Sequence, residues 1–119
     1  MNLQLATEAQ GELDAFRAID DMLVAGIEGC FDNLRLDADE FEAESDAGFS
    51  IEPVVALKRR GADVFRVRFD EFIPGIRILF FRHRRGVFVT GIHKREDLYD
   101  PLKAPMVRAL NYWGRRRYL

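Results

Sequence analysis

The stretch from Val64 to His93 constrains the fold of this chain more than any other part of the sequence. It contains three runs rich in β-branched and aromatic residues, separated by short Gly-containing connections at 72–75 and 83–86. A parallel crossover needs a dozen or more residues, so these connections are too short to form one. The stretch therefore predicts three antiparallel strands joined as a meander.

Arginines alternate with apolar residues along the first two runs. Phe65 and Val67 are predicted to share one face of a strand, and Arg66 and Arg68 the other, because successive side chains point to opposite faces. Arg77 holds the same kind of position in the second run, between two isoleucines. One face of the sheet should therefore belong to the core and the other should carry charge.

The size and composition of the chain predict one domain over residues 1–119, because 48% of its 119 residues are hydrophobic. The single Cys30 excludes an intramolecular disulfide framework, and with two histidines it cannot complete a four-ligand His/Cys zinc site. There is no basic N-terminal segment, and Arg77 interrupts the longest apolar run, so neither a signal peptide nor a membrane span is expected. We expect a cytoplasmic protein that needs no metal or cofactor and makes no membrane contact.

Charge is distributed unevenly along the chain. Residues 1–52 hold 14 of the 20 Asp and Glu but two of the 18 Lys and Arg, a net charge of −12, whereas the remaining residues carry +10. A solvated exterior of mixed charge is one interpretation. However, the basic residues are mostly arginines on predicted strands, which favours a basic surface suited to phosphate.

The flanking segments predict helices and one short strand. Residues 2–6 could form an edge strand, and Thr7 with Gln10 resembles a capping box that opens a helix ending near Gly26 and Gly29. A second, weakly packed acidic helix is expected over residues 32–47. A C-terminal amphipathic helix should begin at Asp100 and Pro101 and end at Gly114. Its apolar stripe consists of Leu102, Met106, Leu110 and Trp113.

The order of these elements, together with three short motifs, resembles the RelE/ParE superfamily of toxin–antitoxin toxins, including its HigB branch. The motifs are an aromatic residue with two cations at 65–68, a Gly-x-Arg-hydrophobic run at 75–78, and His-Lys-Arg-Glu at 93–96 followed by Tyr99. The resemblance covers residues 54–100. It implies an α+β fold in which an N-terminal helical hairpin packs on a small twisted antiparallel sheet, with the amphipathic helix at the C-terminus.

For function, the resemblance implies the toxin of a type II toxin–antitoxin system that cleaves mRNA on the ribosome. The implied partners are a cognate antitoxin, the ribosome and mRNA. Attack of a ribose 2′-OH on the adjacent phosphodiester needs a proton acceptor, a proton donor for the leaving group and cations, but no metal.

Carried over by motif, Arg66 and Arg68 hold the positions of a cation pair, Arg77 and Arg95 those of phosphate-contacting arginines, and Tyr99 that of a stacking or proton-transferring tyrosine. Arginine stands where related toxins often have lysine, and a guanidinium with a pKa above about 12 is a poor base.

His93 and Glu96 are therefore further catalytic candidates, and Lys58 and Lys94 are candidate phosphate contacts. The structural alternative for His93 is a strand-end residue bonded to backbone, and for Glu96 a salt bridge that positions an arginine.

Two other classes of function stay open. A ParE-like protein would keep this fold, bind DNA gyrase and cleave no RNA. A catalytically silent interaction protein would use its arginines to bind an acidic partner.

Overall fold

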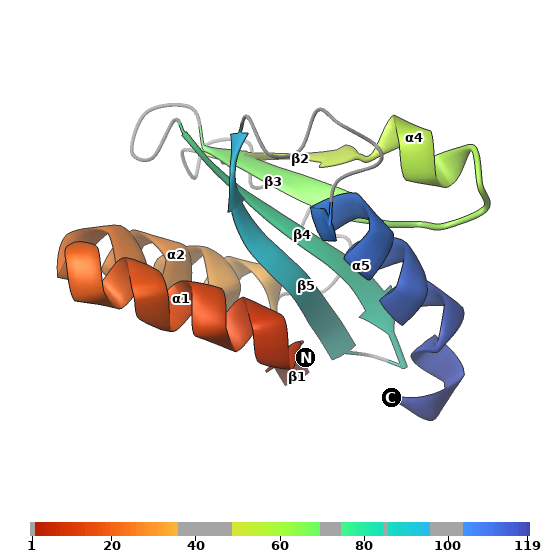
Figure 1. Cartoon of the computed structure of the whole chain (residues 1–119), viewed down its shortest axis with the longest axis horizontal. Coiled ribbons are helices and arrows are strands. Elements are labelled where there is room, and N and C mark those ends of the chain that lie inside the picture. Colours follow the sequence, from red (N-terminus) through yellow and green to blue (C-terminus); the bar gives the residue numbers. More distant parts are fainter. Residues whose placement is uncertain (1, 36–48, 70–74, 85, 96–103) are drawn as a thin grey trace.

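The computed structural model describes residues 2–35, 49–69, 75–84, 86–95 and 104–119. Five strands form one sheet in the order β1-β5-β4-β3-β2, with helices packed on it (Figure 1). The strands are β1 (Asn2–Leu5), β2 (Phe49–Pro53), β3 (Phe65–Phe69), β4 (Ile76–His83) and β5 (Gly86–Lys94). The helices are α1 (Thr7–Ile19), α2 (Asp21–Leu34), α4 (Val55–Lys58) and α5 (Ala104–Gly114), followed by the 3-10 turn η3 (Arg116–Tyr118). The predicted α+β class is confirmed.

The predicted meander is also confirmed, because β3, β4 and β5 pair antiparallel in chain order. Pairing between β4 and β5 shifts by one residue after Leu79, which lies opposite Gly91, whereas the next residue, Phe80, lies opposite Val89. Thr90 is thus an extra residue in β5, a β-bulge of the kind that bends and twists a strand. β4 has no extra residue, so its odd-numbered side chains share one face along its whole length.

The sheet differs from the expected one at its first strand. β1 pairs parallel with β5, from Asn2 opposite Gly86 to Leu5 opposite Val89. The chain therefore opens with a strand, and α1 and α2 follow it. The prediction of a helical hairpin at the N-terminus was wrong, because β1 precedes the helices, and the predicted antiparallel sheet contains one parallel pair, β1 with β5. The suggested strand at residues 2–6 is present.

The first predicted helix is in fact two helices. α1 ends at Ile19 and α2 begins at Asp21, because the Asp20 carboxylate accepts hydrogen bonds from two backbone N–H groups of the next turn, at 3.0 and 3.3 Å. An aspartate that caps a new helix competes with continuation of the old one. Ile19, the last residue of α1, is 83% exposed at this break. The predicted capping box at Thr7 was also wrong, since α1 begins without a side-chain cap.

The structure describes only parts of the other predicted elements. The predicted second helix at 32–47 falls mostly on residues 36–48, which lie outside the described residues, as do Asp100, Pro101 and Leu102. α2 ends at Leu34, and β2 follows at Phe49, where no strand was predicted. The described part of the C-terminal helix matches its prediction and ends at Gly114.

The sheet carries helices along β5 and across β4 (Figure 1). α5 packs through aromatic contacts, with Trp113 edge-on against Phe81 at 5.4 Å between ring centroids and Tyr112 against Phe88 at 5.2 Å. Phe81 has the same strand parity as Arg77, so α5 covers the charged face of the sheet at its other end. No helix in the described ranges is long and apolar enough to cross a membrane.

Candidate functional site

Three polar side chains lie directly opposite one another on neighbouring strands. Arg68 of β3 is paired with Arg77 of β4, and Arg77 is paired with His93 of β5. Directly opposed residues project to the same face, and Arg66 lies two positions from Arg68 on that face. The predicted shared face of Arg66, Arg68 and Arg77 is therefore confirmed, and His93 belongs to it. We call these four residues the polar face.

The four residues lie at different depths. Arg77 is 5% exposed and His93 6%, whereas Arg66 is partly buried and Arg68 is exposed. The Arg77 Nη1 donates a hydrogen bond to the Ile76 carbonyl at 3.0 Å, so its guanidinium is held within the sheet. Arg66 and Arg68 are the members of this set that solvent reaches most easily.

A carboxylate of β2 holds the two outer arginines. Glu52 lies opposite Arg66, and its Oε2 accepts a hydrogen bond from Arg66 Nη2 at 2.8 Å, while its Oε1 is 3.6 Å from Arg68 Nη1. The hydrogen bond from Arg66, opposed by partial burial and supported by both arginine charges, lowers the pKa of Glu52. Sequence reasoning missed Glu52 because β2 was not predicted. The alternation of Phe49 and Ile51 with polar residues was the available signal.

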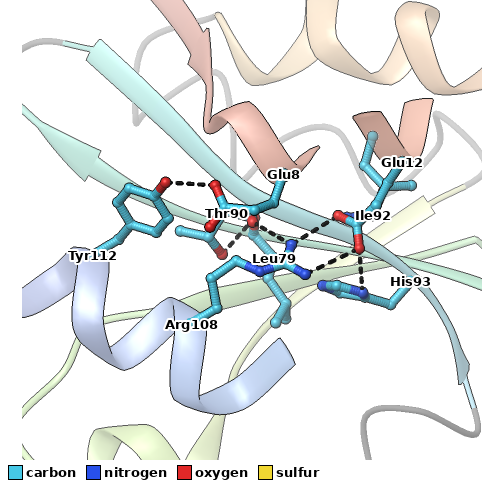
Figure 2. Close-up of polar contacts among 8 residues, drawn as sticks. All are labelled: Glu8, Glu12, Leu79, Thr90, Ile92, His93, Arg108 and Tyr112. Atoms are coloured by element: carbon cyan, nitrogen blue, oxygen red, sulfur yellow. Dashed lines mark hydrogen bonds and ion pairs between the residues drawn. The ribbon is translucent and has the colours of Figure 1, made fainter. Parts of the chain in front are cut away.

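A second carboxylate lies where α1, β5 and α5 meet (Figure 2). The Glu12 Oε2 is 3.1 Å from His93 Nδ1, and its Oε1 accepts hydrogen bonds from the Ile92 backbone N–H at 3.1 Å and from Arg108 Nη1 at 2.9 Å. The guanidinium of Arg108 also donates from Nη2 to Glu12 Oε2 at 3.3 Å and from Nη1 to the Thr90 carbonyl at 3.1 Å. We call Glu12, His93 and Arg108 the Glu12 cluster.

The electrostatics of this cluster favour an ionised carboxylate. Burial raises the pKa of Glu12, but the hydrogen bonds from His93 and Arg108 outweigh burial and lower it. The ionised Glu12 accepts a hydrogen bond from the Nδ1–H group of His93, and Nε2 is the other nitrogen of that ring. That Nε2 is buried and has no hydrogen-bond partner among the described residues. The ring lies over Gly91, where any Cβ would collide with it.

A further hydrogen bond joins α1 to α5. The Tyr112 hydroxyl donates to Glu8 Oε1 at 2.6 Å, which raises the pKa of Tyr112 and lowers that of Glu8. Glu8 and Glu12 are one turn apart on α1, as Arg108 and Tyr112 are on α5. Two parallel contacts therefore fix α5 against α1, and neither was visible in the sequence because the partners are about 100 residues apart.

The structure describes three of the remaining predicted site residues, namely Lys94, Lys58 and Arg95. Lys94 lies opposite Ile76 and so projects to the face of the sheet opposite to that of Arg77 and His93, while its role as a phosphate contact stays a prediction. Lys58 ends α4, which lies in the connection between the last residue of β2, Pro53, and the first residue of β3, Phe65. The Arg95 backbone N–H donates to the Gly75 carbonyl at 2.8 Å, beside the start of β4. Tyr99 and Glu96 lie outside the described residues.

Other chemistries find little support in the described residues. Burial raises the pKa of the Cys30 thiol to about 12, so the thiolate that a nucleophilic cysteine needs does not form at neutral pH. No group of three or more His, Cys, Asp or Glu side chains is placed to hold a metal in the part of the chain that the structure describes.

Comparison with models of protein families, with curated proteins and with solved structures finds no match. The superfamily resemblance therefore rests on the motifs of the sequence.

Proposed function

We propose that this chain is a RelE-like toxin that cleaves mRNA on the ribosome without a metal. The observation that carries the proposal is the placement of Arg68, Arg77 and His93 directly opposite one another on three strands, with Arg66 beside them. Cations next to an imidazole suit a reaction in which a proton is removed from a hydroxyl while negative charge grows on a phosphate.

The arginines would bind and stabilise the phosphate. Arg66 and Arg68, the more accessible pair, would contact the phosphodiester, and the buried Arg77 would stabilise the charge that develops on it. Arg77 is held by packing, so it needs little reorganisation during the reaction, which is the condition for a large electrostatic effect.

His93 would be the proton acceptor. Its Nε2 would remove the proton of the ribose 2′-OH, the new bond would form between O2′ and phosphorus, and the bond from phosphorus to O5′ would break. The departing O5′ would take a proton from water, leaving a 2′,3′-cyclic phosphate. Glu12 would act as a positioning residue that keeps the proton of the ring on Nδ1.

Burial of His93 gives this role a specific test. If Nε2 accepts the proton, His93→Gln should lower the cleavage rate by about 10²- to 10⁴-fold without changing mRNA binding. If His93 only joins strand and helices, the variant should unfold more easily but cleave normally at temperatures where it is folded. Far-UV circular dichroism would establish the folded fraction in each assay.

Incubation with programmed ribosomes tests the proposed function itself. Cleavage at a defined codon position supports the RelE-like function. DNA breakage that depends on gyrase would instead support the ParE-like alternative. Absence of both would favour a silent interaction protein.

The silent alternative has one observation in its favour, namely that Arg66 and Arg68 are already paired with Glu52. Salt dependence of binding separates the two cases. Binding of single-stranded RNA through these arginines should weaken steeply with salt, with a slope of roughly −0.7 per neutralised phosphate. A flat dependence would indicate a protein partner recognised by other contacts.

A further inference from the structure

The carboxylate of Glu52 occupies the position in which a phosphate would meet the outer arginines. It lies within hydrogen-bonding distance of Arg66 and within ion-pair distance of Arg68, with one oxygen directed to each. A phosphodiester presents two non-bridging oxygens to guanidinium groups in much the same way. Glu52 and a bound phosphate would therefore use the same donors.

The hold of Glu52 on these donors is incomplete. Arg66 donates to it from Nη2, while Nε of the same guanidinium is buried without a hydrogen-bond partner among the described residues. The contact to Arg68, at 3.6 Å, is an ion pair longer than a hydrogen bond. Glu52 therefore engages only part of the donor set of Arg66.

The location of Glu52 also allows it to leave. In the order of the described strands, β2 is the last of the sheet, and the Glu52 side chain is 33% exposed. A displaced carboxylate on an outer strand can return to water, so its release does not leave a buried unpaired charge.

From these contacts we propose that Glu52 is a built-in competitor that weakens binding of single-stranded RNA phosphate at Arg66 and Arg68. This inference rests on the proposed function for the identity of the ligand. It makes a prediction of opposite sign to that of a structural role. A competitor lowers affinity, so its removal tightens binding, whereas a residue that merely orients the arginines would weaken binding when removed.

The test measures binding of a fluorescent 2′-O-methyl RNA oligonucleotide, which lacks the attacking hydroxyl and cannot be cleaved. Glu52→Gln should bind it about fivefold more tightly than the parent chain, equivalent to about 1 kcal/mol. Glu28→Gln is the matched control, because Glu28 also pairs with an arginine at 2.8 Å, Arg17, but on the exposed surfaces of α1 and α2. It changes the net charge equally and should leave affinity within twofold.

A second background separates competition from a general effect of charge. In Arg66→Gln the competitor has lost its hydrogen-bonded partner, so adding Glu52→Gln should improve affinity by less than twofold. Equal improvement in both backgrounds would overturn the proposal, as would unchanged or weaker binding in Glu52→Gln. Thermal unfolding of each variant ensures that only folded protein is compared.

Two further outcomes of these measurements distinguish a failure of this inference from a failure of the proposed function. Tighter RNA binding by Glu52→Gln supports the competitor even if ribosome-bound mRNA stays intact, an outcome that would refute the nuclease alone. If Glu52→Gln tightens binding of an oligoglutamate peptide but not of the RNA, the site is one for an acidic protein and the inference is wrong.

Discussion

Two carboxylates flank the arginines of the sheet and differ in what surrounds them. Glu12 bonds to groups from β5 and α5 and lies against a histidine whose side chain is 5% exposed. Glu52 instead pairs with Arg66 and Arg68 at an outer strand, where all three side chains are at least 30% exposed. The same pairing of carboxylate and guanidinium thus occurs in two settings. Burial and the number of elements joined, rather than the pair itself, decide whether such a contact stabilises the fold or remains displaceable.

The largest effect is expected when Arg77, which lies on the sheet between these two carboxylates, is replaced. Arg77→Ala should lower ribosome-dependent cleavage by about 10²- to 10³-fold, because a preorganised donor is lost where charge develops. Arg77→Lys should recover part of this loss, since an ammonium restores charge but not two-pronged geometry. Cleavage would be quantified on programmed ribosomes, with growth inhibition as the readout in cells.

Arg84→Ala is the control for Arg77, because Arg84 lies in the exposed β4–β5 turn and donates to the Arg117 carbonyl at 3.1 Å. It should cleave normally, as should Arg85→Ala, although Arg85 lies outside the described residues. Parent-like cleavage by Arg77→Ala would mean that no arginine-centred site exists.

Next in size is the effect of Glu12 on stability. Glu12→Gln should lower the free energy of unfolding by about 2 kcal/mol, because it removes the charge that compensates partly buried Arg108 and disturbs the bond to the Ile92 N–H. Urea unfolding measures the change. Glu28→Gln should cost less than about 0.5 kcal/mol, since the pair it breaks is exposed. Equal costs for the two variants would remove the distinction between the partly buried Glu12 and the exposed Glu28.

The dependence of unfolding free energy on acid pH also distinguishes Glu12 from Glu52. The folded-state pKa of Glu12 lies below its ordinary value of 4.5, so its contribution to stability is fully present above pH 4.5 and is lost as pH falls through the lower folded value. The difference in unfolding free energy between the parent and Glu12→Gln should therefore shrink below pH 4.5. Glu52→Gln should show a smaller difference at every pH, because its site is more exposed. Urea titrations from pH 7 to pH 3 would measure both.

The smallest effect is expected at the second contact between α1 and α5. Tyr112→Phe removes the hydroxyl bonded to Glu8 but keeps the ring packed on Phe88, so it should cost under about 1 kcal/mol. Because the pKa of Tyr112 is raised, this contribution is present below pH 10 and is lost as pH rises through the folded value. A loss as large as that of Glu12→Gln would show that the exposed contact holds α5 as strongly as the Glu12 cluster does.

Local pattern predicted the parts of the fold that depend on neighbouring residues. Alternation placed Arg66 and Arg68 on one face and located the three strands of the meander, because strand parity is a property of the backbone alone. The apolar spacing of Met106, Leu110 and Trp113 likewise predicted the amphipathic C-terminal helix. Periodicity failed at Asp20, where apolar spacing runs through the break and a capping side chain decides the ends of two helices.

The candidate site was predictable only as far as its cations. Arg66, Arg68, Arg77 and His93 could be named because they stand on predicted strands, but neither carboxylate that holds them was foreseen. Glu12 and Arg108 are 96 residues apart, and Glu52 and Arg66 are 14 apart across a strand pair whose first member was not recognised.

By itself, then, the sequence determined the α+β class, the meander and the face on which its arginines project, since these follow from residue type and from a two-residue repeat. Only the tertiary structure decided that β1 joins the sheet in parallel, that His93 is buried against Glu12, and that Glu52 holds the outer arginines. The physical reason is that these features depend on which distant elements pack together. A charge acquires its partner and its degree of burial from that packing, and no local pattern encodes either.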